Sequence, residues 1–454
     1  MNNSALVRFA PVVVALVTIP AGVLAGNNPM PLFADAAARD LGGAAMGVIQ
    51  AANLALPALL LAVPLGAVAV RRYAAAFVLA GGLFLLLAGQ LAAQYAGSVP
   101  VFGAARTLEG FGAGLLFPAV LTLCWQRRTR LSLAAFAGIL VASLIVCVPL
   151  TLAVLPDEGI AWRTALTPVP WLVGLALAAA AVVVFLRGRD VTAAPMRAAE
   201  RTQLLLPLVP AAGFAFLSMI AAGDLWAPGV TIIIAGLALV ALTGMAVVGS
   251  RDTTTGSPLG TALVMVVVGL LAQPVAGPLA GVSMAERGVD LTTVAVFAAG
   301  GASAIAAALA SVRLGERAAA RSVTIGHLCA LAAMAALLLT GADTATGLLA
   351  VPLALLGAGL GLALACSLRG ARLGSALFGL TLCFPSVLVG HLLCGSLEIS
   401  RVARIEDRSA ALAEGFRMWL VVAGGVALVL AVVIVLVARR RDTRTPDSLS
   451  TAFH

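Results

Sequence analysis

Two charged side chains, Arg106 and Glu109, stand three positions apart inside an apolar stretch of the chain. On a helix this spacing places both side chains on one face, where they can form an ion pair. A low-dielectric surrounding favours a protonated carboxyl group, whereas a neighbouring arginine favours the carboxylate. A ligand or a conformational change that alters either influence would make Glu109 take up or release a proton. The alternative is a permanently paired salt bridge that only fixes its helix against the neighbouring helices.

The other polar groups within apolar stretches are few. His391 is a candidate for a titrating group, or for a neutral histidine that hydrogen-bonds one helix to another. Amide side chains in or near such stretches either bind a ligand or join helices, and they are Asn27, Asn28, Gln50, Asn53 and Gln273. The sequence has no metal-ligand spacing and no assignable nucleophile–base pair, so we expect neither an enzyme nor a cofactor other than protons.

The composition determines the kind of element that must hold these groups. Hydrophobic residues make up 62% of the 454 residues and charged residues 10%, whereas soluble proteins have about 45–50% and about 25%. A soluble enzyme and a disordered chain are therefore excluded. Long continuous apolar runs, in place of short alternating ones, predict an all-α polytopic membrane protein and not a β-barrel. No phosphate-binding loop of the Gly-x-x-x-x-Gly-Lys type is present, which excludes direct coupling to ATP.

About 20 apolar residues cross a hydrocarbon layer of about 30 Å. On this measure the sequence predicts fourteen transmembrane helices. Their approximate ranges are 7–26, 46–70, 74–96, 101–125, 131–155, 164–186, 204–222, 228–249, 259–283, 291–313, 322–340, 347–368, 374–397 and 417–438. The longest loop on the outer side, 398–416, has apolar residues at helical spacing and predicts a short interfacial helix.

The basic residues predict the orientation of these helices. The formal net charge is +9, and all 28 basic residues are arginines, most of them in alternate short loops. This distribution follows the positive-inside rule of membrane topology and does not indicate a nucleic-acid surface. It predicts a multi-pass protein of the cytoplasmic (inner) membrane, with an even number of spans and with both termini in the cytoplasm.

An internal repeat predicts the organisation into domains. The run Gly110-Phe111-Gly112-Ala113-Gly114 returns as Gly357-Ala358-Gly359-Leu360-Gly361, and the turn at Val70-Arg71 returns at nearly the same offset as Glu316-Arg317. The offset exceeds six helices by about one helix pair. We therefore expect two pseudo-symmetric six-helix bundles with an inserted helix pair. The predicted parts are a first bundle at 1–187, a linker and inserted hairpin at 188–258, a second bundle at 259–438, and a cytoplasmic tail at 439–454.

With these features the sequence resembles the major facilitator superfamily, and within it the fourteen-span drug:proton antiporters. The stretch Gly66-Ala67-Val68-Ala69-Val70-Arg71-Arg72 stands where that family has a Gly-x-x-x-Asp-Arg turn. The segment Arg106-Thr107-Leu108-Glu109-Gly110-Phe111-Gly112 is similar to the family's Arg-x-x-Gln-Gly-x-Gly segment on the fourth helix. The sequence also departs from the family, because Val70 replaces the Asp, and Asn27 and Asn28 stand near the end of a first helix that lacks the usual acidic residue.

The resemblance implies a secondary transporter that works by alternating access, with its gating loops at Gly66, Arg71, Arg72, Glu316 and Arg317. It supports a transport role for Arg106, whereas proton coupling at Glu109 is predicted from its ion pair with Arg106 in an apolar stretch. The leading hypothesis is efflux of a small amphipathic or cationic molecule in exchange for protons, as in multidrug resistance. A cavity poor in charge favours apolar or weakly basic substrates over sugars or phosphates.

Two alternatives remain open at this point: an uncoupled facilitator or importer, suggested by the missing Asp at position 70, and a non-transporting membrane scaffold. The expected partners are the small-molecule substrate and the lipid bilayer, without nucleic acid. The resemblance implies a monomer and leaves open a partner in the outer envelope.

Overall fold

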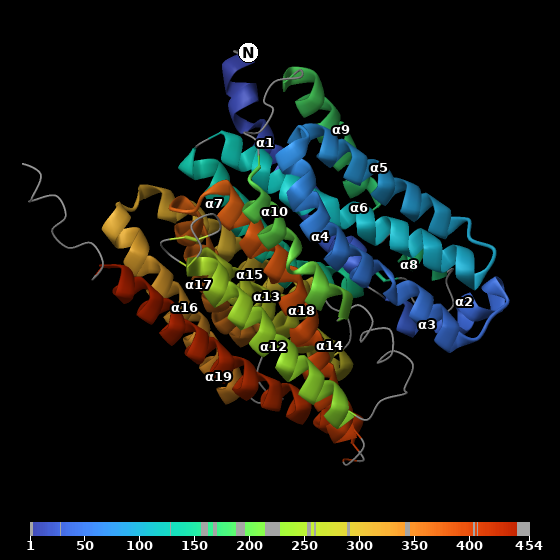
Figure 1. The fold of residues 1–454 in the computed structure, drawn as a ribbon. Helices are drawn as coiled ribbons and strands as arrows, with labels where there is room; N and C mark the ends of the chain where they lie inside the picture. The colour runs from blue at the N-terminus through green and yellow to red at the C-terminus, as the bar shows by residue number, and fades with distance from the viewer. Residues whose placement is uncertain are drawn as a thin grey trace, which may run out of the picture.

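The computed structural model describes residues 3–27, 29–127, 129–155, 162–166, 170–187, 196–213, 228–251, 256–257, 260–287, 291–340, 346–402, 405 and 407–442. In these residues the chain is a bundle of long helices without β-strands (Figure 1). Twelve of the described helical stretches are long and apolar enough to cross a membrane. The chain is therefore a multi-pass helical membrane protein, as its composition predicts.

The described residues of the first half of the chain form seven long helices and several short ones. Their bounds are α1 (Asn3–Gly26), η1 (Met30–Leu32), α2 (Ala34–Leu41), α3 (Ala45–Asn53), α4 (Ala55–Arg72), α5 (Ala75–Gln94), α6 (Val99–Gln126), α7 (Arg130–Val154), α8 (Trp162–Ala165), α9 (Pro170–Arg187), α10 (Ala198–Leu205) and α12 (Pro228–Arg251). The second half contains α13 (Thr261–Leu271), α14 (Gln273–Arg287), α15 (Leu291–Ala310), η2 (Ser311–Arg313), α16 (Glu316–Leu339), η3 (Thr346–Leu349), α17 (Ala350–Arg369), α18 (Leu373–Val402) and α19 (Arg408–Asp442).

The expected count of fourteen spans stays a prediction. The expected helix at 164–186 is present as α9, whose described apolar part, Trp171–Val184, is shorter than a full span. Of the expected helix at 204–222, residues 214–222 lie outside the described residues. The prediction of a separate interfacial helix at 398–416 was wrong for the described residues. The helix α18 continues to Val402, and α19 already begins at Arg408.

Two expected spans are each divided into two helices. The first breaks between α3 and α4, and the second between α13 and α14. In both cases a proline, Pro57 or Pro274, stands in the first turn of the later helix, where its missing N–H costs nothing. Pro274 has no N–H to bond the carbonyl four residues before it, so the break at Ala272 has a local cause.

The repeated glycine runs lie where helices approach most closely. The helix α6 packs between α4 and α5, and α17 packs between α15 and α16. A Cβ atom on Gly110 would lie 1.9 Å from the Ala55 carbonyl oxygen, and one on Gly357 would lie 2.0 Å from the Gly300 carbonyl oxygen. In both halves the glycines therefore let one central helix touch the backbone of its neighbour.

The two halves of the chain meet along several helices. From the first half, α7 packs against α15 and α17, and α4 and α6 pack against α18. The helix α12 lies along α18 and α13 (Figure 1), where Gly249 faces the Phe378 ring. The short helix α10 contacts both α4 and α18, so this part of the linker touches both halves.

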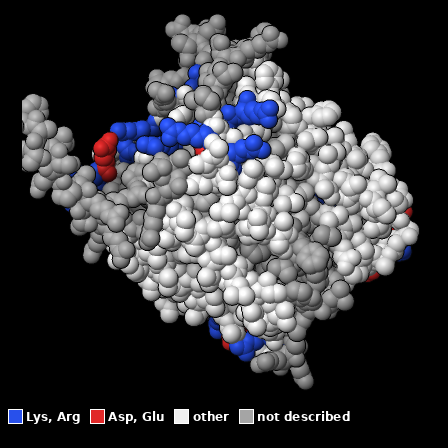
Figure 2. Space-filling view, viewed as in Figure 1, with Lys and Arg blue, Asp and Glu red and all other residues white. Residues whose placement is uncertain are grey.

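Arginine side chains gather at one end of the molecule, near the start of α1 (Figure 2). We call this the arginine-rich end; it includes Arg71 and Arg72 at the end of α4. By the positive-inside rule this end is predicted to face the cytoplasm.

We predict that Gly110→Ala destabilises the fold, because the added methyl group would overlap the Ala55 carbonyl oxygen. Overpacking of this kind costs about 1–3 kcal/mol, which a lower midpoint of thermal unfolding in detergent would report. Gly81→Ala on α5 is the control, because a Cβ at that glycine meets nothing within 4 Å. Equal midpoints for the two variants would contradict the close approach.

Candidate functional site

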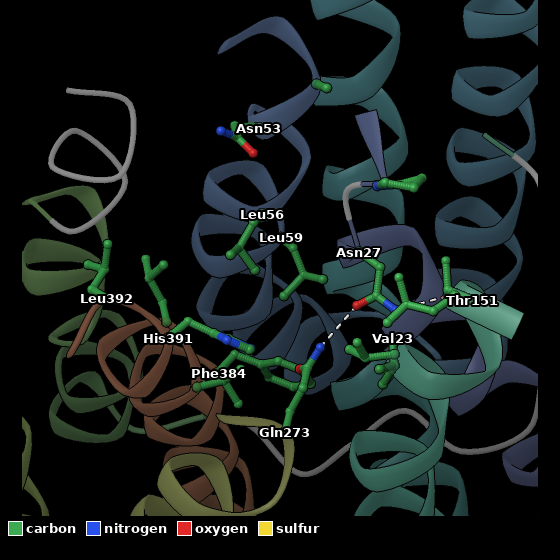
Figure 3. A pocket seen from close by; sticks show the side chains of 17 residues that line it. Val23, Asn27, Asn53, Leu56, Leu59, Thr151, Gln273, Phe384, His391 and Leu392 are labelled. Carbon is green, nitrogen blue, oxygen red and sulfur yellow. Dashed lines mark hydrogen bonds between the residues drawn. The ribbon is translucent and has the colours of Figure 1, made fainter. Parts of the chain in front are cut away.

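A cavity of about 390 Å³ lies between the two halves of the chain. Its walls come from α1, α3, α4 and α7 of the first half and from α14 and α18 of the second. This volume lies within the range of about 300–1,000 Å³ that small-molecule sites occupy. Most of the lining side chains are aliphatic, and a few amide, hydroxyl and imidazole groups stand among them (Figure 3).

The cavity is closed by side-chain packing toward the arginine-rich end. Its deepest aromatic residue, Phe384 on α18, contacts Phe117 on α6 with 4.3 Å between the ring centroids. The Phe117 ring also packs on α1, where a Cβ atom on Gly22 would lie 2.9 Å from Cζ. The residues of α13 before the cavity, 261–272, are all buried. The lining residues instead lie in the parts of α1, α7 and α18 that are distant from the arginine-rich end.

A chain of hydrogen bonds crosses the cavity from one half to the other. The Gln273 amide nitrogen donates to Asn27 Oδ1 at 3.0 Å, and Asn27 Nδ2 donates to Thr151 Oγ1 at 3.3 Å (Figure 3). The Thr151 hydroxyl donates in turn to the carbonyl oxygen of Cys147 at 2.7 Å. Asn27 therefore bridges α14 and α7 from the end of α1.

The structure brings four of the predicted polar residues to the cavity wall, namely Asn27, Asn53, Gln273 and His391. Gln50 lies on α3, half-buried and outside the lining, and Asn28 lies outside the described residues. The imidazole of His391 lies beside Gly277 of α14, where a Cβ atom would be 3.6 Å from His391 Cε1.

Sequence reasoning missed Thr151 and Phe384, both of which line the cavity. For Thr151, the missed signal was a single hydroxyl residue just after Pro149 in an apolar stretch. Phe384 precedes Pro385 in a similar stretch, and nothing in its local sequence marks it as a cavity residue. Within the part of the chain that the structure describes, no three His, Cys, Asp or Glu residues are grouped as metal ligands would be.

Arg106 and Glu109 form an ion pair inside the first half, with side chains only 3% and 2% exposed. Arg106 Nη2 also donates to the backbone carbonyls of Ala25 at 3.3 Å and Asn27 at 3.1 Å, at the end of α1. Its Nε donates to the carbonyl of Ala52, near the end of α3, at 3.5 Å. One guanidinium group therefore ties the ends of two other helices to α6.

The ion pair does not line the cavity. Glu109 Oε1 accepts a hydrogen bond from Gln90 Nε2 on α5 at 3.4 Å, so the carboxylate faces away from the second half. Its connection to the cavity runs through Arg106 to Asn27, whose carbonyl binds Arg106 and whose side chain lies in the cavity. In this conformation the pair fixes α6 against α1, α3 and α5.

At the arginine-rich end, Arg71 pairs with Glu200 of α10, with Nε 3.0 Å from Oε1. Arg71 Nη2 also donates to Glu200 Oε2 at 3.2 Å. The neighbouring Val70, which stands where the resembling family has an acid, is fully buried. The acid that pairs with Arg71 thus comes from the linker helix.

The other predicted gating residues lie at the same end. A Cβ on Gly66 would lie 3.2 Å from Pro118 on α6, so α4 and α6 are close there. The exposed Arg72 lies over the Tyr73 ring at 5.7 Å. Glu316 and Arg317 are exposed in the first turn of α16.

Comparison with known proteins gives a fold but no close relative. No sequence-family description matches the chain, and no curated protein matches it in sequence. Solved structures do match over nearly the whole chain. A peptide transporter, POT, crystallised with sulfate has 15% identity and a TM-score of 0.55, covering 96% of this chain and 94% of that one.

Two further structures are equally similar. The human organic anion transporter MFSD10 (TETRAN) has 15% identity and a TM-score of 0.56, with 94% of this chain and 98% of that one covered. The major facilitator superfamily proton:xylose symporter XylE, bound to 6-bromo-6-deoxy-D-glucose, has 15% identity, a TM-score of 0.54 and 96% coverage of both chains. The chain therefore has the fold of major facilitator transporters.

We predict that Arg106→Gln lowers stability strongly, because it leaves Glu109 buried without its counter-charge and removes a donor from the carbonyls of Ala25 and Asn27. Breaking a buried pair on one side costs about 3–5 kcal/mol. Thermal unfolding of the purified protein in detergent would measure the loss. Arg72→Gln, at an exposed position, is the matched control and should leave the midpoint unchanged; a similar loss in both variants would disprove the assignment.

Proposed function

We propose that the chain is a secondary transporter that moves a small amphipathic or cationic molecule across the membrane by alternating access. The observation that carries this proposal is a cavity between the two halves that is closed toward one end by Phe117 and Phe384. In transporters of this type, the substrate site lies between the repeats near the middle of the membrane. Rocking of one half against the other would then expose the cavity at each end in turn.

The contacts at the arginine-rich end are those that must separate when the cavity opens there. They are the aromatic contact between Phe117 and Phe384 and the contact of α10 with α18, where the Arg71–Glu200 pair holds α10 to α4. Neither contact lies deep within one half, so both can break while the helices of each half keep their packing. This arrangement supports a cycle with two states of similar free energy.

The proposal places the arginine-rich end and both termini in the cytoplasm of a cell with an inner membrane, in accordance with the positive-inside rule. The cavity would then face the outside in this conformation. The chain would act as a monomer of the fourteen-span drug:proton class, with its two remaining spans at 164–186 and 204–222. A partner in the outer envelope is compatible with this assignment, and nucleic acid has no role in it.

Proton-coupled efflux, as in multidrug resistance, is the leading form of this proposal, with Glu109 as the proton carrier. Protonation of Glu109 would remove the counter-charge of Arg106, which also binds the carbonyl of Asn27. A change at the buried pair would thus reach the side chain of Asn27 in the cavity. The same path would let a bound substrate alter the pair.

A second candidate is a facilitator or importer without proton coupling. It is favoured by the cavity itself, because its described lining contains no carboxylate. Glu109 is buried outside this lining and has two partners, Arg106 and Gln90. A carboxylate held in this way can stay ionised throughout the cycle and serve only to fix α6.

We predict that Glu109→Gln abolishes accumulation driven by a pH gradient, to the level of protein-free vesicles, while expression stays normal. A substrate would first be found by comparing the drug susceptibility of cells that lack and cells that overproduce the protein. Uptake of that substrate into energised vesicles is then measured for the wild type, for Glu109→Gln and for the control Asp35→Asn, whose carboxylate is exposed on α2.

Each outcome decides between the two forms of the proposal. Full pH-driven accumulation in Glu109→Gln would remove this residue from coupling. Counterflow of substrate that ignores the pH gradient in the wild type would favour the facilitator. For a proton carrier, we expect both variants to retain counterflow and only Glu109→Gln to lose accumulation.

A further inference from the structure

We infer that the ligand of the cavity is an uncharged amphipathic molecule, with a hydrogen-bonding group bound by Gln273 and His391 and an apolar part packed on Phe384. This inference rests on the transport function proposed above and narrows its substrate class. The proposed function alone allows both neutral molecules and permanent cations as substrates, and this inference favours the neutral molecules.

The charges around the cavity argue for a neutral ligand. No Asp, Glu or Arg is among the described lining residues. Moving a charged group out of water without a counter-charge costs several kcal/mol, so an ionic ligand would bind at a disadvantage. The one titratable side chain in the lining, His391, can donate or accept a hydrogen bond when neutral and would repel a cation when protonated.

The end of α1 could have offered a cation site, but its carbonyl groups are already occupied. A helix C-terminus carries partial negative charge on its free carbonyl oxygens, and α1 ends beside the cavity at Gly26. The carbonyls of Ala25 and Asn27 both accept hydrogen bonds from Arg106. The guanidinium therefore occupies the carbonyl groups at the end of α1 that would otherwise attract a positive ligand.

The polar groups that remain available belong to the second half. Gln273 is 9% exposed, and its amide nitrogen is taken by Asn27. Its amide oxygen has no hydrogen-bond partner among the described residues, and neither has the His391 ring. Both side chains extend from α14 and α18 into the cavity (Figure 3). They can accept from an N–H or O–H group of a ligand and, at the imidazole, also donate to it.

The rest of the cavity fits the apolar part of such a molecule. Phe384 presents its ring at the deep end, and Leu56, Leu59 and Leu388 complete the wall around it. The few polar groups cannot satisfy the many hydroxyl groups of a sugar, each of which would lose water on entry. An aromatic or aliphatic body with one amide, phenol or alcohol matches both the volume and the polar groups.

The test uses three probes with one aromatic body and different charge, namely N-(naphthylmethyl)acetamide, naphthylmethyl-trimethylammonium and naphthylacetate. Equilibrium binding is measured with the full chain in lipid nanodiscs. We expect the neutral acetamide to bind about tenfold or more tightly than either ion. His391→Leu should weaken acetamide binding about tenfold, the effect of one lost hydrogen bond.

A variant that introduces a negative charge into the cavity makes the test specific. Gln273→Glu adds a carboxylate of the same shape to the cavity, and we expect the ammonium probe to gain about tenfold while the acetamide loses affinity. Gln50→Glu, on α3 and outside the lining, is the control and should change neither. If Gln273→Glu does not fold, as judged by size-exclusion chromatography, His391→Glu places a carboxylate in the same cavity and should give the same reversal.

The outcomes separate this inference from the transport function. Equal or tighter binding of the ammonium probe to the wild type, an unchanged preference in Gln273→Glu, or no binding of any probe would overturn the inference. Counterflow of a cationic substrate from the susceptibility screen would also overturn it while supporting transport. Absence of counterflow for every substrate in that screen would instead overturn the transport function.

Discussion

The contacts of Arg106 allow helices to end inside this membrane protein. The helix α1 ends at Gly26 and α3 ends at Asn53, so the last carbonyl groups of both helices lack partners within their own helix. The guanidinium of Arg106 donates to carbonyls at both ends, and Glu109 supplies its counter-charge. A buried arginine is tolerated only when it is paired and its donors are satisfied. The shape of the first half at its interface therefore depends on this one group.

The cavity lies where these helices end. The end of α1, the junction between α3 and α4 and the start of α14 all contribute to its wall. Continuous helices would present only side chains to this space, whereas ended helices also turn the chain and bring Asn27 and Gln273 within 3.0 Å of each other. Irregular backbone at membrane depth is tolerated where it lines a cavity. The prolines at positions 57 and 274 make the two later breaks inexpensive.

The sequence was sufficient for features that depend on local spacing, such as the pairing of Arg106 with Glu109. It predicted α3 and α4 as one helix because the junction is as apolar as its surroundings. The contact of Phe117 with Phe384 and the pair of Arg71 with Glu200 join segments distant in the chain. No local pattern encodes such partners, since they follow only from how the two halves pack.

The distribution of strong and weak contacts suits a transporter. The charged contact with the most hydrogen bonds, at Arg106, lies within the first half and holds four helices together. Between the halves, beside the apolar packing of α7 on α15 and α17, stand the neutral hydrogen bond of Gln273 to Asn27 and one aromatic contact, the last two each worth about 0.5–1.5 kcal/mol. The Arg71–Glu200 pair, with side chains 13% and 11% exposed, joins α4 to α10, which also contacts α18. The strongest charged contacts therefore hold the first half together, whereas the specific contacts of Gln273 and Phe384 across the interface are individually weak.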